Sequence, residues 1–271
     1  MSLPHFYLEE QVLADEGAEA FPLRLSRDDA KHARVLRLAV GEHVAVVDAA
    51  RDYFECEIVS FGDAELIVRI AQRFGAAETE PQVVLVQGLA KGDKMDEVIR
   101  HATELGVTAF VPLLCERSIV KLDAKKTAAK TERWRSIAKS AAMQSGRRFV
   151  PEVAEPAAIK DVCASLADAT AVLVCWEEAP GTAYLDEALA GALAVADVAP
   201  DAVRVAVVVG PEGGLTHAEV DALIACNPHA SFVTLGPSIL RTETAGVVAP
   251  ALVLYELRRL ARTAANAESV R

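Results

Sequence analysis

Two short strand-like segments that each stop at a Gly-Pro pair constrain the fold more than any other feature of the sequence. Residues 203–209 form a β-branched apolar run that ends at Gly210-Pro211, and residues 231–235 form a short strand-like segment that ends at Gly236-Pro237. A short apolar run like the first, bounded by turn residues, is typical of a strand that is buried on both faces. The two segments indicate an α/β domain with a parallel sheet.

Each segment is followed by signals for the start of a helix. Thr216 and Glu219 have the spacing of a capping box, and a second helix is expected to begin near Arg241 or Thr242. Glycines let a backbone approach a ligand closely, and the first turn of a helix offers unpaired N–H groups. In open α/β sheets, ligands bind beyond the carboxyl ends of the strands. Two such joints therefore favour a ligand pocket over two ordinary connecting turns.

The spacing of these glycines excludes the common nucleotide-binding fingerprints. Neither G-x-G-x-x-G nor G-x-x-x-x-G-K-[ST] is present. The segments Gly210-Pro-Glu-Gly-Gly214 and Leu235-Gly-Pro-Ser-Ile-Leu-Arg-Thr-Glu-Thr-Ala245 instead resemble the SPOUT class of S-adenosylmethionine-dependent RNA methyltransferases. The resemblance implies that both segments enter a deep trefoil knot, which holds the cofactor in a bent conformation. Knots are rare exceptions to the rules of chain topology.

Length and composition exclude several classes of protein. A chain of 271 residues with 52% apolar and 25% charged residues suits one large or two modest globular domains. No apolar run is long enough to span a bilayer, and the first residues do not form a secretory signal. The five scattered cysteines (Cys56, Cys115, Cys163, Cys175 and Cys226) are typical of buried thiols in a reducing cytosol, with neither disulfides nor a metal site. We therefore expect a cytoplasmic protein that binds no metal and contacts no membrane.

The first 74 residues predict a small β-rich domain. Strand-like runs occupy residues 43–48, 53–60 and 65–70, and one short helix is expected between Ser26 and Gly41. Ser26 is its predicted N-cap, and Val35, Leu36 and Leu38 are expected to face the sheet. A polar stretch at residues 75–81 predicts a linker between two domains.

Four basic residues of the predicted N-terminal helix (Arg27, Lys31, Arg34 and Arg37) recur at spacings that place most of them along one side. The net charge of the chain is −11, so a general nucleic-acid-binding surface is not expected. A local basic face in an acidic protein is either a solvated helix face or an RNA contact, and both interpretations stay open here.

The second domain predicts alternating strands and helices. A strand at 82–88, a helix at 94–105 that begins after Asp93 and ends at Gly106, and a strand at 108–112 form a β-α-β unit with a parallel pair. Helices are expected at 128–144 and 156–166, a strand at 171–176, and a short helix with a loop and no chemistry at 181–200. The last helix is expected at 242–262, with a kink near Gly246 caused by Pro250, and residues 263–271 are expected to be frayed. Its wide apolar face is either a dimer contact or intramolecular core (Val247, Val248, Leu252, Val253, Leu257 and Leu260).

Further motifs make the resemblance more specific. Several segments of the second domain resemble the bacterial RsmE family, which methylates N3 of one uridine in 16S ribosomal RNA. These segments are Lys91, Lys94, Glu104-Leu-Gly106, Glu116-Arg-Ser118 and Gln144-Ser…Arg147…Pro151. The resemblance implies a PUA-like β-barrel that binds RNA at residues 1–74 and a SPOUT α/β-knot domain at residues 82–271. It also implies a homodimer, S-adenosylmethionine as cofactor, and 16S rRNA or the small ribosomal subunit as partner.

Two other functions are weighed against uridine-N3 methylation. One is a different SPOUT enzyme, such as a ribose 2′-O-methyltransferase of tRNA or rRNA, because the two glycine segments are shared within the class. The other is a non-catalytic RNA-binding factor of ribosome assembly that keeps the fold. The glycines and Arg241 argue against that last function, because a disused pocket is free to lose them.

The site residues follow from these motifs. The cofactor is expected to contact the glycine segments, the strand end at 176–177 and the start of the last helix (Trp176, Glu177, Gly210, Pro211, Glu212, Gly213, Leu235, Gly236, Ile239, Leu240 and Thr244). Trp176 fits core packing equally well, and Glu243 and Thr244 fit a helix cap. RNA is expected to contact eight basic residues (Arg27, Lys31, Arg34, Arg37, Lys91, Lys94, Arg117 and Arg147).

The target imide nitrogen must lose its proton. The candidates for this chemistry are Glu212 and Glu243 as bases and Arg241 as the group that stabilises negative charge on uracil oxygens. The sequence does not decide between a carboxylate base and an arginine.

Overall fold

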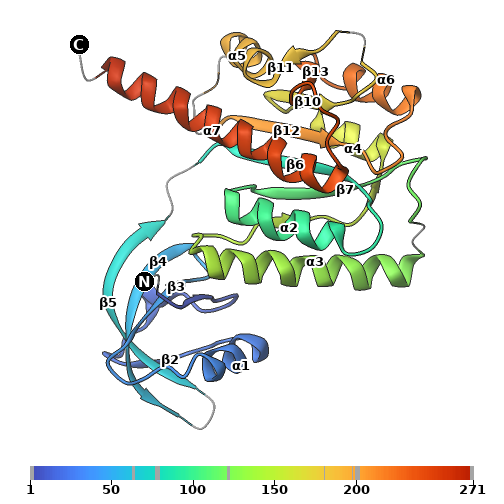
Figure 1. Cartoon of the computed structure of the whole chain (residues 1–271). Helices are drawn as coiled ribbons and strands as arrows, with labels where there is room; N and C mark the ends of the chain where they lie inside the picture. The colour runs from blue at the N-terminus through green and yellow to red at the C-terminus, as the bar shows by residue number, and fades with distance from the viewer. Residues whose placement is uncertain are drawn as a thin grey trace. The chain divides into compact units, whose positions relative to one another are not determined.

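The computed structural model describes residues 3–62, 65–76, 80–120, 123–179, 181–196, 198 and 202–268. The chain divides into two compact units (Figure 1). Unit 1 comprises residues 1–78 together with residues 142–150, and unit 2 comprises residues 79–141 and 151–271. Each unit has its own hydrophobic core.

Unit 1 is built on a curved, mostly antiparallel sheet (Figure 1). In the described residues its strand order is β1-β3-β4-β5-β2, and only the β1–β3 pair is parallel. The strands are β1 (His5–Tyr7), β2 (Phe21–Leu23), β3 (His43–Val47), β4 (Asp52–Phe61) and β5 (Leu66–Ala76). A 3-10 turn, η1 (Leu13–Asp15), and the helix α1 (Arg27–Val35) complete the unit.

The predicted strands at 43–48, 53–60 and 65–70 are confirmed as β3, β4 and β5, whereas β1 and β2 were not predicted. Ser26 caps α1 as expected, because its hydroxyl accepts a hydrogen bond from the Asp29 N–H at 3.1 Å. The expectation that Val35 and Leu36 face the sheet is wrong, since they are 71% and 39% exposed. The helix ends at Val35 and the chain turns through a left-handed Arg37, with φ of 52°, so Leu38 packs on the core instead.

Residues 142–150 pack into unit 1 although the chain reaches them from unit 2. The helix α3 (Ala124–Ser145) ends with Ala142 and Met143 against Tyr7 and Val47. The Tyr7 hydroxyl donates a 2.6 Å hydrogen bond to the carbonyl of Arg147. Nothing in the local sequence pattern predicted this attachment.

Unit 2 is an α/β domain on a parallel sheet. In the described residues the strand order is β11-β13-β10-β12-β6-β7-β8, with β9 also paired to β7, and every pairing is parallel. The strands are β6 (Gln82–Gly88), β7 (Ala109–Leu114), β8 (Glu152–Val153), β9 (Ala157–Ala158), β10 (Ala171–Cys175), β11 (Ala183–Tyr184), β12 (Arg204–Val209) and β13 (Ala230–Thr234). The five longer strands and the parallel β6–β7 pair confirm the predictions, and the two-residue strands were missed.

Helices cover both faces of this sheet (Figure 1). Alternate residues of the central strands point to opposite sides: Val205 and Val207 pack toward one core, and Ala206 and Val208 toward the other. The first side is covered by α2 (Lys94–Leu105), α3, α5 (Leu185–Val195) and α7 (Thr242–Glu268), and the second by α4 (Ile159–Leu166) and α6 (His217–Ala225). Burial on both sides explains why the strands read as continuous apolar runs.

The helix ends follow the predicted signals in part. The capping box of Thr216 and Glu219 is present in both directions, and Gly106 ends α2 with φ of +126°. Asp93 precedes α2 but its side chain makes no capping bond, because its backbone angles (φ −97°, ψ 9°) depart from the extended conformation that caps favour.

The last helix, α7, differs from its prediction. It contains Pro250 as expected but continues to Glu268, so the expected fraying is wrong for residues 263–268, while residues 269–271 lie outside the described residues. The alanines in this stretch are strong helix formers.

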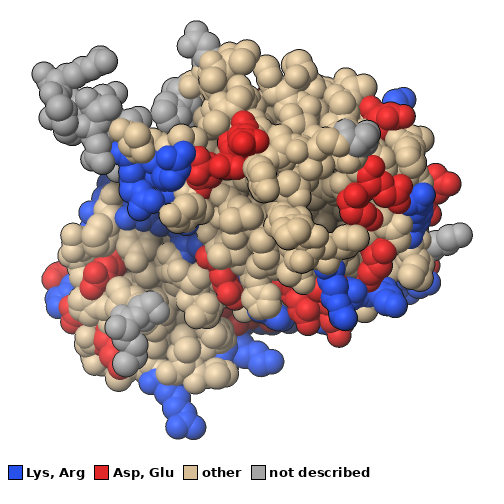
Figure 2. All heavy atoms as spheres, turned by 45° about the horizontal axis from the view of Figure 1, so that its top comes forward, with Lys and Arg blue, Asp and Glu red and all other residues tan. Residues whose placement is uncertain are grey.

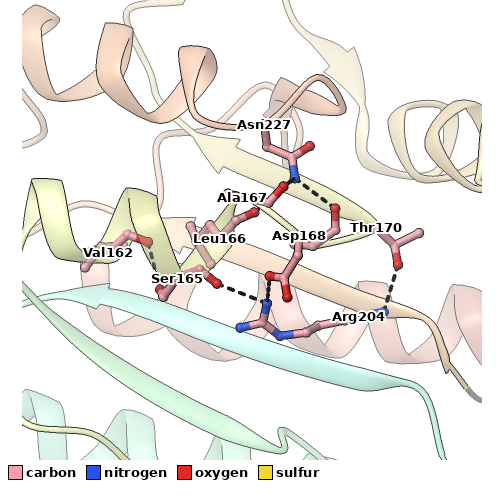
Figure 3. Close-up of polar contacts among 9 residues, drawn as sticks. Val162, Ser165, Leu166, Ala167, Asp168, Thr170, Arg204 and Asn227 are labelled. Atoms are coloured by element: carbon pink, nitrogen blue, oxygen red, sulfur yellow. Dashed lines mark hydrogen bonds and ion pairs between the residues drawn. The ribbon is translucent and has the colours of Figure 1, made fainter.

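A polar cluster ties the amino ends of the sheet strands together (Figure 3). The buried Asn227 side chain donates to the carbonyls of Leu166, Ala167 and Ala169 at 2.9, 3.2 and 2.8 Å. Its oxygen accepts from the His229 N–H at 2.7 Å. One amide side chain therefore joins the end of α4, the start of β10 and the start of β13.

All five cysteines are free thiols, but only Cys56 and Cys115 are fully buried. Among the described residues no helix has the length and apolar character needed to cross a bilayer.

Candidate active site

The two glycine turns of unit 2 line one cavity of about 490 Å³ at the carboxyl ends of β10, β12 and β13. The turn after β12 contributes Gly210, Pro211, Glu212 and Gly214, and the turn after β13 contributes the whole stretch 235–242. Figure 2 shows a hollow on this face among mostly uncharged residues, with acidic side chains along one rim. The sequence prediction that these distant segments meet in one pocket is consistent with this geometry.

Close packing around the first turn requires glycine. A Cβ on Gly88, at the end of β6, would lie 2.4 Å from the nitrogen of Pro211. A Cβ on Gly210 would lie 3.2 Å from the side chain of Leu215. The first turn is therefore pressed against the end of the neighbouring strand, and the backbone itself forms the cavity wall.

A buried chain of hydrogen bonds joins the two turns. Gln87 donates through Nε2 to the hydroxyl of Thr242 at 2.8 Å, and Thr242 donates in turn to the carbonyl of Gly210 at 2.6 Å. Gln87 and Thr242 are 1% and 7% exposed. Thr242 is the first residue of α7, so this chain fixes the start of the helix to the first glycine turn.

The second turn is held by its own threonine. The Thr234 hydroxyl donates to the carbonyl of Gly236 at 3.1 Å and accepts from the Gly236 N–H at 3.2 Å. Gly236 has φ of +119°, which disfavours a residue with a side chain.

Lys94 lies between two carboxylates at the cavity. Its Nζ is 3.1 Å from Glu212 Oε1 and 2.9 Å from Glu243 Oε2, and the three side chains are each between 19% and 25% exposed. The ion pair with Lys94 holds the pKa of Glu243 below its usual range, and the same contacts raise the pKa of Lys94. Burial opposes ionisation of Glu212, but hydrogen bonds from its own backbone N–H and from Lys94 leave its pKa lowered. Both carboxylates are therefore anionic near neutral pH.

The loop that follows β7 contacts the first glycine turn through Arg117. Arg117 donates through Nη1 to the carbonyls of Leu215 and Gly213 at 3.2 and 3.5 Å. The buried Glu219 accepts from the backbone N–H of Glu116 at 2.8 Å. The loop that carries Glu116 and Arg117 is thereby fastened to the start of α6.

Most residues predicted to bind the cofactor lie in the cavity wall. These are Trp176, Glu177, Gly210, Pro211, Glu212, Leu235, Gly236, Ile239 and Leu240. Arg241 also lines the cavity and is exposed.

Three predicted site residues lie elsewhere. Gly213 does not line the cavity, because it faces the backbone of Arg117, where a Cβ would be 2.8 Å from the carbonyl oxygen. Thr244 is exposed on α7, outside the lining. Glu243 does not line the cavity but contacts the lining residue Lys94.

Trp176 is both core and cavity wall, so the two interpretations of the sequence are not exclusive. It is 6% exposed, its ring meets the His217 ring edge-on at 5.1 Å, and it also packs against Phe232. Its indole Nε1 is buried and has no hydrogen-bond partner among the described residues.

The residues predicted to bind RNA are dispersed. Arg27, Lys31, Arg34 and Arg37 are exposed on or just after α1, and Lys91 is exposed in unit 2. Lys94 and Arg117 form the protein contacts described above, and their contact with RNA stays a prediction. Arg147 lies in unit 1 with its guanidinium 4.3 Å from the centroid of the Phe149 ring.

Several lining residues were not predicted from the sequence. Thr234 and Thr242 hold the turns, Gly214 lies in the wall with φ of +70°, and Thr182 belongs to a stretch expected to have no chemistry. Gly214 and Thr242 sit inside the quoted motifs, so they carried a usable signal. Thr182 carried none.

The sequence is similar to known RNA methyltransferases. A family model described as an RNA methyltransferase domain matches residues 78–254. The chain is 33% identical over 251 residues to the ribosomal RNA small subunit methyltransferase E of Bacillus subtilis, with 89% of this chain and 93% of that protein covered. The protein of the same name from Mycobacterium bovis is 33% identical over 250 residues, with 90% and 88% covered.

Similar solved structures include proteins with bound S-adenosylmethionine, and one of them carries the same name as these relatives. It is the ribosomal RNA small subunit methyltransferase E of Neisseria gonorrhoeae bound to S-adenosylmethionine, with a TM-score of 0.74 and 26% sequence identity. The match covers 93% of this chain and 97% of that chain.

Proposed function

We propose a reaction for this chain from the premise that it belongs to the ribosomal RNA small subunit methyltransferase E family of RNA methyltransferases. The protein transfers a methyl group from S-adenosylmethionine to 16S ribosomal RNA of the small subunit. The observation that carries this proposal is the single cavity formed by the two glycine turns. A family relative with 26% identity is bound to the same cofactor.

The residues of the cavity fit S-adenosylmethionine. About 490 Å³ is within the usual range for a cofactor site. Leu235 and Leu240 provide an apolar wall for the adenine. Trp176 also lines the cavity, and within the described part of the chain its buried Nε1 is a donor without a partner. The backbone of Gly210 to Glu212 permits close approach to the ribose and the methionine end. When bound, the cofactor supplies the electrophilic methyl group.

The acceptor atom is N3 of a uridine. This nitrogen normally takes part in a base pair, so the uracil must be unpaired or flipped out of its stack. Arg241 is the exposed cation of the cavity wall and suits the developing negative charge on the uracil oxygens. Glu212 and Glu243 are less suited as bases, because Lys94 lowers the proton affinity of both. We assign them to holding Lys94, and we assign charge stabilisation to Arg241, with the N3 proton leaving to solvent water as the methyl group is transferred.

Three structural features belong to the proposal. The two glycine turns form a trefoil knot, which is supported by β12 and β13 flanking β10 and by the bond from Thr242 to Gly210. The sheet of unit 1 is a PUA-like barrel that contacts RNA. The chain forms a homodimer through the outer face of α7, where Leu252 and Tyr255 are 42% and 63% exposed while Val253 and Leu257 are buried in the core. Val253 and Leu257 are therefore intramolecular core, and the exposure of Leu252 and Tyr255 supports the proposed dimer contact.

Mass spectrometry of digested small-subunit rRNA tests the reaction. The RNA is incubated with enzyme and S-adenosylmethionine, and the modified nucleoside is identified. We expect N3-methyluridine at one position, from free rRNA or from assembled subunits. A methyl group on a ribose 2′-oxygen would instead identify a different enzyme of the same class, and no methylation of either substrate would indicate an assembly factor.

A pair of variants tests the role of Arg241. Arg241→Gln keeps the size of the side chain and removes its charge, so the turnover number is expected to fall about 100-fold while the dissociation constant for S-adenosylmethionine is unchanged. Arg258→Gln, on the exposed surface of α7, is the matched control. Equal turnover by the Arg241 variant and wild type would remove Arg241 from the chemistry.

A further inference from the structure

Unit 1 contains a second cavity, of about 330 Å³, between α1 and the adjoining ends of β4 and β5. We call it the α1 pocket. Leu25, Ala33 and Leu66 form an apolar wall, and Phe61, Arg34 and Arg37 also line it. The apolar wall belongs to the core of unit 1, so the pocket is an opening of that core to the surface.

A bulge in β4 places Phe61 in this pocket. Ile58 pairs with Val68 and Ser60 pairs with Ile67, so Val59 is an extra residue in the β4–β5 ladder. One extra residue reverses the alternation of side chains, and Phe61 then pairs directly with the buried Leu66. Directly paired residues share a face of the sheet, so Phe61 lies on the core face. It is nevertheless 51% exposed.

Two arginines line the same opening without partners among the described residues. Arg34 lies in the last turn of α1 and is exposed. Arg37 follows the helix with φ of 52°, a conformation that favours glycine and disfavours arginine. The pocket therefore combines a half-exposed aromatic ring, an apolar wall and two free guanidinium groups.

We propose that the α1 pocket binds one unpaired nucleotide of the RNA substrate. The base stacks on Phe61 against the apolar wall, and Arg34 and Arg37 contact the flanking phosphates. Unpaired bases stack on aromatic side chains, and guanidinium groups pair with phosphate oxygens. Glu65, also at the pocket, offers an acceptor for a base N–H group. This inference rests on the proposed function, because it assumes that RNA is the substrate.

Methyl-transfer kinetics with small-subunit rRNA tests the pocket. Three variants are each expected to raise the KM for RNA about tenfold and to leave the dissociation constant for S-adenosylmethionine unchanged. They are Phe61→Ala, Arg34→Gln and Arg37→Gly. The two arginine variants are also expected to reduce the slope of log affinity against log salt by about one each, whereas Phe61→Ala leaves the slope unchanged.

Arg37→Gly separates binding from folding. Glycine relieves the left-handed backbone, so the thermal midpoint of this variant is expected to equal or exceed that of wild type while its KM for RNA rises. Arg24→Gln and Arg51→Gln are charge-matched controls in unit 1 that lie outside the pocket.

The outcomes distinguish this inference from the proposed function. If the wild type methylates rRNA and the Phe61 and Arg37 variants have the same KM for RNA as the wild type, the pocket assignment is wrong and the proposed function stands. An equal rise in KM for Arg24→Gln and Arg51→Gln would also overturn the pocket, because general electrostatics would then explain the effect. If wild type methylates no rRNA, the proposed function itself fails.

Discussion

Thr242→Val removes the hydroxyl that joins the two glycine turns and leaves the side-chain shape almost unchanged. In the folded protein this hydroxyl accepts from Gln87 Nε2 at 2.8 Å and donates to the Gly210 carbonyl at 2.6 Å. Valine keeps the β-branched shape, so packing at the start of α7 is retained. The variant therefore removes one hydrogen bond from each of two polar groups, although Gln87 Nε2 keeps a 3.3 Å hydrogen bond to the Gly88 carbonyl.

The expected cost follows from that count. A buried polar group that loses its hydrogen bond costs about 1–3 kcal/mol, so two groups predict a loss of about 2–6 kcal/mol in the free energy of unfolding. The retained bond from Gln87 to Gly88 and the partial exposure of Gly210 favour the lower end of this range. Because Gly210 lines the cavity, release of its carbonyl is also expected to weaken S-adenosylmethionine binding several-fold. Thr242→Ser keeps the hydroxyl, so it is expected to retain most of the stability and most of the cofactor affinity of the wild type.

Urea unfolding followed by tryptophan fluorescence measures the effect. The chain has two tryptophans, Trp134 and Trp176, and both are buried in unit 2, so the signal reports the unit that carries the site. Thr263→Val, on the exposed surface of the same helix, controls for the loss of a threonine. The reasoning is refuted if Thr242→Val unfolds at the same urea concentration as wild type and binds the cofactor equally well.

Four further predictions concern other parts of the structure. Asn227→Leu removes the donor for the carbonyls of Leu166 and Ala169 and is expected to lower the free energy of unfolding by about 2–4 kcal/mol in the same urea assay, with cofactor affinity unchanged. Burial lowers the pKa of His5 to about 4, so the unfolded chain binds more protons than the folded one between pH 6.5 and 4. The free energy of unfolding is therefore expected to fall by about 3 kcal/mol as the pH is lowered over that interval. His5→Phe should abolish this fall when unfolding is measured by circular dichroism. The lowered pKa values of Glu212 and Glu243 contribute stability above about pH 4.5 that is lost as pH falls through their folded values, so Lys94→Met should show a smaller loss of urea resistance between pH 7 and 3. Gly88→Ala brings a Cβ within 2.4 Å of Pro211 and is expected to raise the dissociation constant for S-adenosylmethionine in calorimetry. Gly191→Ala, whose Cβ would meet no atom of another described element within 4 Å, should leave it unchanged.

Local signals predicted much of unit 2. Continuous apolar runs identified the long strands, because a strand buried on both faces has no polar alternation to obscure it. The Thr216–Glu219 spacing predicted a cap that depends only on residues three positions apart. The glycine turns predicted a shared cavity, since both follow strands of one parallel sheet and the carboxyl ends of such strands lie at one edge.

Unit 1 shows where local signals fail. β1 and β2 have three residues each, which is too short for a periodic pattern. Residues 142–150 contact unit 1 through Tyr7 and Val47, partners that lie far away in sequence. Val35 and Leu36 have helical spacing for burial, yet the helix ends at Val35. Each failure arises from a tertiary contact or a chain reversal that the neighbouring residues do not encode.

The candidate site combines both kinds of information. Lys94 was expected to contact phosphate because it follows a strand end, but the structure places it between Glu212 and Glu243, which approach from two other loops. A cation at a strand end therefore cannot be assigned to a substrate until the carboxylates around it are known. The role of Gln87 likewise could not be predicted from the sequence, because its partner Thr242 lies 155 positions away.

The link from Gln87 through Thr242 to Gly210 has a consequence for how substitutions act on this protein. Gln87 belongs to β6 and Thr242 to α7, and α7 packs so closely there that a Cβ on Gly246 would lie 2.3 Å from the Gln87 side-chain oxygen. A change at Gly246 therefore displaces Gln87, and Gln87 holds the hydroxyl that positions the Gly210 carbonyl. Because interiors are closely packed, such a displacement is transmitted with little loss. Residues of the sheet and helix core should thus alter cofactor affinity without touching the cofactor, and stability and binding should change together along this chain of contacts.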